Sequence, residues 1–123
     1  MLPEKLIQSI FFQLAFALKY LHAKKIFHRD IKLENILIQF LNNEIQIVLC
    51  DFGCSKCVSK TGVIKGVTQV GTHNYMSPEM MDRTVTTHYS VDIWSLGVLI
   101  CYLCNNKVNL FSSLLKMGYL LIP

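Results

Sequence analysis

Proline, glycine and charged residues are all scarce in this chain of 123 residues. It has 3 prolines, 6 glycines and 16% charged residues, against 52% hydrophobic residues. This composition excludes a disordered chain and a collagen-like chain. No internal repeat, low-complexity tract or Pro/Gly-rich linker divides the sequence. These absences leave one small domain with a hydrophobic core.

Apolar runs long enough to span a bilayer are also missing. The longest run, residues 93–104, is too short for a span and contains Ser95 and Gly97. The N-terminus lacks a basic stretch followed by an apolar core and a cleavage site, so we expect no secretory signal. Because the mean hydropathy is nonetheless positive, we interpret the chain as the inner part of a larger fold and expect no membrane partner.

Positive charge is in modest excess and is not clustered. The formal net charge is +4, and the lysines form no run of five or six. A nucleic-acid-binding surface requires clustered basic residues, so no nucleic-acid partner is expected.

The five cysteines are Cys50, Cys54, Cys57, Cys101 and Cys104. An odd number does not suit a disulfide framework and favours a reducing, intracellular and cytoplasmic setting. Two Cys-x-x-Cys pairs have the spacing of zinc ligands. The second pair, however, ends a strongly apolar stretch and is interpreted as core, so we expect no zinc site.

The hydrophobic period predicts two main helices. Residues 4–23 carry apolar side chains at helical spacing, and Pro3 suits the first turn. Residues 91–104 are apolar on every side, which predicts a helix that is buried all round. A third, weak helix is expected over residues 110–116.

A hairpin and two loops are expected between the two main helices. Residues 36–40 and 45–49 are short β-prone runs joined through Asn42-Asn43, which is typical of a hairpin. Residues 24–35 break the helical period and are rich in charge. Residues 51–79 show little periodicity, and a loop of that length inside a domain is usually functional.

Three short motifs follow one another in order. Residues 28–35 read His-Arg-Asp-Ile-Lys-Leu-Glu-Asn, residues 51–53 read Asp-Phe-Gly, and residues 77–79 read Ser-Pro-Glu. The chain thereby resembles the eukaryotic serine/threonine protein kinases from near its first helix to its last residue. Lys32 together with Thr72 is the serine/threonine-type pattern. One motif alone would be weak, but all three at fitting spacings are specific.

The resemblance implies a catalytic centre that uses ATP and Mg²⁺ and acts on serine or threonine hydroxyls of protein substrates. Asp30 matches the carboxylate that accepts the hydroxyl proton, and Lys32 matches the lysine that steadies the transferred phosphate. Asn35 and Asp51 match the two metal ligands, in keeping with the preference of Mg²⁺ for oxygen. Leu37 matches the apolar residue beneath the adenine ring.

Other matches imply structural roles. His28 and Phe52 match a stacked column that links the catalytic loop to the Asp-Phe-Gly motif, which Gly53 completes. Asp92 matches a buried acid that braces the catalytic-loop backbone, and it must accept hydrogen bonds because an unpaired buried carboxylate is costly. Glu79 matches the acid of the third motif, whose usual late-helix arginine partner is absent.

Each of these residues alone has an ordinary alternative. A lone Asp in a loop is usually a turn residue, a lone Asn is usually a cap, and Leu37 suits a plain strand core. Glu34 either attracts a basic substrate residue or is a solvated charge, and the second interpretation is the simpler one. Four of the eight acids fall on family positions, which argues against their being ordinary solvated surface charges. These four are Asp30, Asp51, Glu79 and Asp92.

Residues 51–79 resemble an activation segment. Thr68 is the candidate phosphorylation site, and Thr72 matches the substrate-facing threonine. Arg29 and Lys56 match basic positions that would bind the phosphate and order the segment. Alternatively, Thr68 is an unmodified loop residue. Weaker phosphorylation candidates are Ser55, Ser59 and Thr61.

The sequence lacks the family's glycine-rich phosphate loop, its strand lysine and its partner glutamate helix. The expected fold class is therefore α+β and mainly α-helical, with residues 1–123 forming a partial kinase domain. It is a protein-kinase-like large lobe with a small β-hairpin, with the small lobe missing and the C-terminal helices truncated. We expect the isolated chain to be inactive without a small lobe supplied by a parent protein. The alternative is a truncated kinase-like binding module without catalysis.

Overall fold

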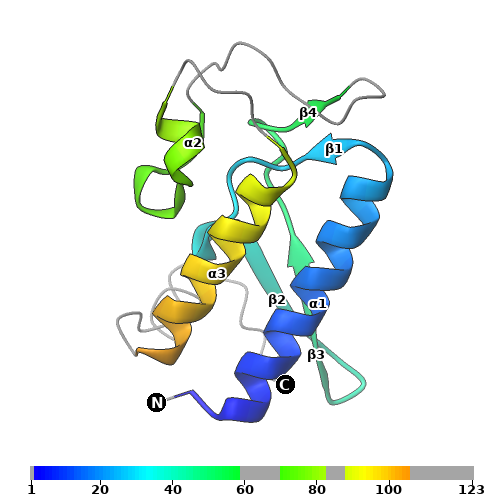
Figure 1. The fold of residues 1–123 in the computed structure, drawn as a ribbon. Coiled ribbons are helices and arrows are strands. Elements are labelled where there is room, and N and C mark those ends of the chain that lie inside the picture. The colour runs from blue at the N-terminus through cyan, green and yellow to red at the C-terminus, as the bar shows by residue number, and fades with distance from the viewer. Residues whose placement is uncertain (1, 59–69, 83–87, 106–123) are drawn as a thin grey trace.

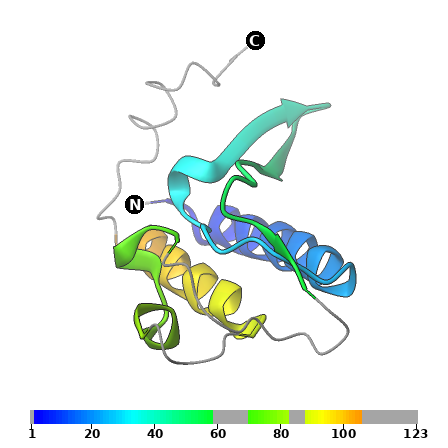
Figure 2. The same ribbon diagram turned by 90° about the horizontal axis from the view of Figure 1, so that it is seen from above.

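Two helices and a hairpin make up most of the structure. The computed structural model describes residues 2–58, 70–82 and 88–105. Helices α1 (Glu4–Ala23) and α3 (Ser90–Cys104) lie side by side and run in opposite directions, and the hairpin lies along one side of the pair (Figures 1 and 2). The expected helix at residues 110–116 lies outside the described residues.

Helix α1 covers the residues for which the sequence predicts a helix. Its core face consists of Ile10, Leu14, Leu18 and Leu21, which recur at three- and four-residue spacing and are buried against α3 and strand β3 (Glu44–Leu49). By length and composition alone, α1 is long and apolar enough to cross a membrane, a test that a core helix also passes. The expectation that no stretch is long and apolar enough for a span is therefore wrong for α1, of whose 18-residue apolar window 17% is buried. Its buried face contacts α3 and β3.

Strands β2 (Ile36–Leu41) and β3 (Glu44–Leu49) form the predicted antiparallel hairpin. The turn between them consists of Asn42 and Asn43, with φ angles of 51° and 64°. Both angles lie in the left-handed region that a two-residue type I′ turn requires and that asparagine tolerates. Each strand is one residue longer at the turn than the β-prone runs indicate.

Gln13 of α1 joins the helix to the outer edge of β3. Its Nε2 donates to the carbonyl oxygen of Ile45 at 2.9 Å, and its Oε1 accepts the backbone N–H of Ile47 at 2.8 Å. Two backbone groups that the hairpin leaves unpaired are thereby satisfied.

Short elements connect these parts. Strands β1 and β4 pair in an antiparallel ribbon near the end of α1. The short elements are β1 (Ile26–Phe27), the 3₁₀ turn η1 (Leu33–Asn35), β4 (Lys56–Cys57), the 3₁₀ turn η2 (His73–Tyr75) and α2 (Pro78–Met81).

Helix α3 is buried on one face only. Leu96, Leu99 and Leu103 pack into the core, whereas Ile93 and Trp94 are exposed beside a groove of about 650 Å³. The helix predicted at 91–104 is present, but the prediction that it is buried all round is wrong, because the described elements pack against a single side of α3. Its two cysteines, Cys101 and Cys104, are exposed rather than in the core, and all five cysteines are free thiols.

We predict that Gln13→Ala lowers the free energy of unfolding by about 1–3 kcal/mol, because the Ile45 carbonyl and the Ile47 N–H lose their partners. Urea unfolding of the 123-residue chain measures this change. Gln8→Ala is the matched control, since its side chain bonds only to Glu4 on the exposed side of the same helix. Equal losses for the two variants would contradict the role given to Gln13.

Candidate active site

The buried carboxylate of Asp92 joins the catalytic loop to both helices. Asp92 lies in the first turn of α3 and is 0% exposed. Its Oδ1 accepts the backbone N–H of Arg29 at 2.8 Å, and its Oδ2 accepts the N–H of His28 at 3.0 Å. His22 at the end of α1 donates Nε2–H to Oδ2 at 2.8 Å. The carboxylate thus makes the backbone contacts that the sequence predicts for Asp92.

Arg29 has an unusual backbone conformation, with φ at 67°. Residues other than glycine rarely adopt such angles unless their surroundings hold them there. The bond to Asp92 holds the main chain, and the Arg29 side chain donates Nε–H to the carbonyl oxygen of Cys54 at 2.7 Å. Burial lowers the pKa of Arg29, and the nearby Cys54 and Asp92 oppose that shift.

Gly71 allows the later part of the loop to pass directly over Arg29. Its φ is 100°, and a Cβ at this position would lie 2.5 Å from the carbonyl oxygen of Arg29. Only glycine fits both the angle and the close approach. The next residue, Thr72, is consequently brought to the catalytic loop.

Asp30 is surrounded by hydrogen-bond donors. Thr72 donates its hydroxyl to Oδ1 at 2.8 Å, the Asn35 amide donates to Oδ2 at 3.2 Å, and Lys32 Nζ lies 3.2 Å from Oδ2. Lys32 also donates to the Thr72 hydroxyl oxygen at 2.8 Å. Burial alone would raise the pKa of Asp30, but the bonds from Thr72 and Lys32 outweigh burial and leave it below its ordinary value.

His28 connects the catalytic loop to the Asp-Phe-Gly motif. It is fully buried, and its Nδ1 accepts the backbone N–H of Asp30 at 3.2 Å. The ring proton is therefore on Nε2, which donates to the carbonyl oxygen of Cys50 at 3.0 Å. The ring of Phe52 lies edge-on to that of His28 at 5.0 Å, so the two predicted column residues are in contact.

Asn35 and Asp51 offer oxygens suited to a divalent cation. The Asn35 side-chain nitrogen donates to the carbonyl oxygen of Asp30 at 2.8 Å, which leaves its Oδ1 as the free ligand atom. The backbone carbonyl of Asn35 accepts the N–H of Cys50 at 2.9 Å. Asp51 is the next residue after Cys50 in the chain. Asp51 is exposed, and its Oδ1 accepts the N–H of Gly53 at 3.1 Å.

These two oxygens fit magnesium better than zinc. Within the described part of the chain, no three His, Cys, Asp or Glu residues converge as metal ligands. Mg²⁺ commonly takes one or two protein oxygens and completes its shell with phosphates and water. Asn35 and Asp51 satisfy that requirement, whereas zinc needs a fuller set of protein ligands.

Other predicted residues lie outside this cluster. Leu37 is half-buried on β2, Lys56 is exposed on β4, and Glu79 is half-buried in α2. Thr68 lies outside the described residues. Direct contacts therefore join the predicted proton acceptor, the lysine, Asn35 and Thr72. Asp51 follows Cys50, whose N–H bonds to the Asn35 carbonyl, and Leu37, Lys56 and Glu79 lie on separate elements.

Several contacts of the site carry no signal in the sequence. In the sequence, His22 is simply a polar residue near the end of a helix, and nothing indicates its bond to Asp92. Cys54 accepts a bond from Arg29 through its backbone carbonyl, which does not depend on the side chain. Ser95 of α3 donates its hydroxyl to the carbonyl oxygen of Tyr75 at 2.7 Å, which ties η2 to the core helix. Burial, followed by the charge of Asp51, raises the pKa of Cys50. Apart from the charge of Asp51, which is next to Cys50 in the sequence, these effects depend on tertiary neighbours.

Comparison with known proteins places the chain among kinases. The family model of the protein kinase domain matches residues 1–116. The chain is 38% identical over 118 residues to the probable serine/threonine-protein kinase CCRP1 of Zea mays, an alignment that covers 96% of this chain and 18% of that protein. It is 50% identical over 91 residues to an Aurora kinase of Debaryomyces hansenii, covering 74% of this chain and 21% of the relative.

A third relative is the meiosis-specific serine/threonine-protein kinase mek1 of Schizosaccharomyces pombe. It is 38% identical over 125 residues, covering 93% of this chain and 28% of mek1. The chain thus spans less than a third of the length of each of these relatives. With the family model matched over most of its length, the chain belongs to the protein kinase family and forms part of a catalytic domain similar to those of serine/threonine kinases.

Proposed function

We propose that this chain is the large-lobe part of a serine/threonine protein kinase, which transfers the γ-phosphate of ATP to serine or threonine hydroxyls of proteins. The observation that carries the proposal is the contact set of Asp30, Lys32 and Thr72, with Asn35 bonded to the same carboxylate. Phosphoryl transfer depends mostly on positioning and charge neutralisation, which this arrangement supplies.

In the proposed mechanism, Asp30 receives the proton of the acceptor hydroxyl. Lys32 lies within reach of both Asp30 and Thr72, so its ammonium group can neutralise charge on the transferred phosphate. Thr72 holds the orientation of the Asp30 carboxylate through its own hydroxyl. Mg²⁺, when bound through Asn35 and Asp51, supplies charge neutralisation at the ATP phosphates. Leu37 contributes an apolar surface for adenine.

The 123 residues provide only one side of an ATP site. A glycine-rich loop and a strand lysine, which cover and grip the phosphates in this family, are not among them. We therefore propose that the isolated chain does not catalyse transfer and that a small lobe in the parent protein completes the site. The free thiols are consistent with an intracellular, cytoplasmic location.

A chimeric kinase tests the catalytic role directly. The stretch of this chain that aligns with the Debaryomyces hansenii Aurora kinase replaces the matching stretch of that enzyme. We predict that the chimera phosphorylates a serine/threonine peptide and that Asp30→Asn lowers kcat at least about 100-fold, because the group that orients the acceptor hydroxyl and accepts its proton is lost.

Two controls accompany this assay of radiolabelled phosphate transfer. Glu44→Gln, the same chemical change at the hairpin tip, leaves the rate unchanged, and the 123-residue chain alone gives no transfer above the blank. A chimera that folds but is inactive with Asp30 intact would favour the alternative, a kinase-like binding module without catalysis.

The pH dependence of the chimera tests how Asp30 is kept ionised. Hydrogen bonds from Thr72 and Lys32 hold the pKa of Asp30 below its ordinary value. We predict that Lys32→Met raises this pKa, so that Asp30 becomes protonated at a higher pH and the acid limb of the kcat profile moves to higher pH. Lys19→Met on the outer side of α1 leaves the limb in place. A lowered rate with an unmoved limb would show that Lys32 acts without influencing Asp30.

Phosphorylation of Thr68 is the proposed activating event. We predict that Thr68→Ala lowers the activity of the chimera severalfold, because Arg29 and Lys56 lose the phosphate that would order the activation segment. Mass spectrometry of the active chimera locates the phosphate, and Thr84→Ala, at a threonine outside the predicted activation segment, serves as the control. Unchanged activity together with an unmodified Thr68 would refute the proposal.

A further inference from the structure

The outward side of α1 carries a row of exposed aromatic side chains. Phe12, Phe16 and Tyr20 are 58%, 67% and 64% exposed. Their four-residue spacing places them one above another on the helix face opposite the buried leucines. We call these three residues the aromatic row; at 1.5 Å per residue it is about 12 Å long. The row takes no part in the proposed active site.

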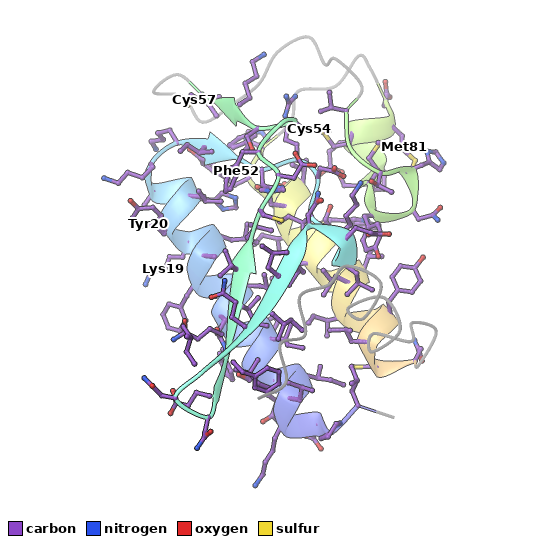
Figure 3. All side chains as sticks on the ribbon, turned by 180° about the vertical axis from the view of Figure 1, so that it is seen from behind. Lys19, Tyr20, Phe52, Cys54, Cys57 and Met81 are labelled. Carbon is purple, nitrogen blue, oxygen red and sulfur yellow. The ribbon has the colours of Figure 1, made fainter. Side chains whose placement is uncertain are left out.

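Lysines stand at both ends of the aromatic row. Lys5 precedes Phe12 by seven residues and Lys19 follows Phe16 by three, so both project from the same exposed side of α1. Figure 3 shows Lys19 and Tyr20 pointing outward from the helix. The Nζ of Lys24 lies 5.8 Å from the centre of the Tyr20 ring. The row is thus flanked by positive charge.

The acids of the chain are concentrated on other elements. The sole acid of α1 is Glu4 at its first residue, where it bonds to Gln8. The remaining acids lie in the catalytic loop, the hairpin tip, the Asp-Phe-Gly motif, α2, the residue after α2, and α3. They are Asp30, Glu34, Glu44, Asp51, Glu79, Asp82 and Asp92. The outward side of α1 is therefore complementary to an anionic partner.

Area and charge argue against a second copy of the chain as that partner. Three aromatic side chains exposed to this degree present on the order of 400 Å², whereas a stable protein interface takes about 800 Å² from each partner. Antiparallel pairing of two such helices would also place Lys5 against Lys19, which is repulsive. A lipid surface needs neither a large nor a shape-matched patch, because aromatic rings insert singly at the headgroup level.

We propose that the aromatic row and its flanking lysines dock this chain on an anionic lipid surface, with α1 lying parallel to the membrane. The rings enter the boundary between headgroups and acyl chains, and the lysines contact acidic headgroups. The opposite face of α1 stays packed on α3 and β3, so the helix does not cross the bilayer. Figures 1 and 2 show α3 between α1 and α2, so α2 would face away from the lipid.

This proposal reverses the sequence-based expectation that there is no membrane partner. That expectation rested on the absence of a long apolar run, which is the criterion for a span. Surface docking depends instead on which residues share one exposed helix face, and the structure supplies that information.

Vesicle binding of the 123-residue chain tests the proposal. We predict that the chain co-sediments with phosphatidylcholine vesicles containing about one-third phosphatidylserine and does not co-sediment with phosphatidylcholine alone. The Phe12→Ser/Phe16→Ser variant binds at least about tenfold more weakly. Phe40→Ser, the same change at a 46% exposed residue of the hairpin, retains binding. Circular dichroism establishes that each variant is folded.

The single tryptophan, Trp94 on the exposed side of α3, reports which surface touches the lipid. We expect brominated lipids not to quench the Trp94 fluorescence of the unmodified chain. In the Phe16→Trp/Trp94→Phe variant, whose tryptophan is in the aromatic row, we expect quenching. Quenching of Trp94 instead would show adsorption through the groove on α3 and overturn the proposal. Equal binding to neutral and anionic vesicles would also overturn the proposal. So would a dimer of the chain in the absence of lipid, if the Phe12→Ser/Phe16→Ser variant is a monomer. Because no assay here measures phosphate transfer, these results are independent of the proposed kinase activity.

Discussion

The Asp92 carboxylate is the contact on which the arrangement of this chain depends. A carboxylate buried without partners would be strongly destabilising, but this one accepts bonds from two backbone N–H groups and from His22. These donors come from α1 and from the start of the catalytic loop, while the acid belongs to α3. One side chain thus fixes the spacing of two helices and the path of the loop between them.

The same contact determines where the chemistry sits. By holding the backbone of His28 and Arg29, Asp92 maintains the left-handed angle at Arg29, next to Asp30, whose carboxylate contacts Thr72 and Lys32. The His28 ring then carries the constraint to the carbonyl of Cys50, immediately before Asp51. Asp51 also has a left-handed backbone, with φ at 59°. The two acids of the proposed centre are therefore linked through a continuous hydrogen-bonded path that starts in α3.

The sequence predicts those features that depend on neighbours along the chain. The range of α1 and the hairpin with its Asn42-Asn43 turn follow from periodicity and turn chemistry, and both occur as expected. The motif residues were identified by resemblance to a family. The distances between their side chains could not be predicted from the sequence. The exposed side of α3 and the bridge made by Gln13 depend on which elements pack together, and composition does not encode that choice. The sequence of an apolar helix does not indicate whether other elements pack against one side of it or against every side.

The lone pairs of Asp30 indicate how an acceptor hydroxyl would approach. A carboxylate offers about four acceptor positions; Oδ2 is used by Asn35 and Lys32, and Oδ1 by Thr72. The remaining position is on Oδ1, beside the Thr72 hydroxyl. In the proposed mechanism, a substrate hydroxyl would approach that oxygen. The donors that keep Asp30 ionised also make it a weaker base. That loss matters little if the transition state is loose, because correct placement of the hydroxyl then contributes more than proton removal. In the proposed mechanism, Asp30 therefore acts more by orienting the acceptor hydroxyl than by its strength as a base.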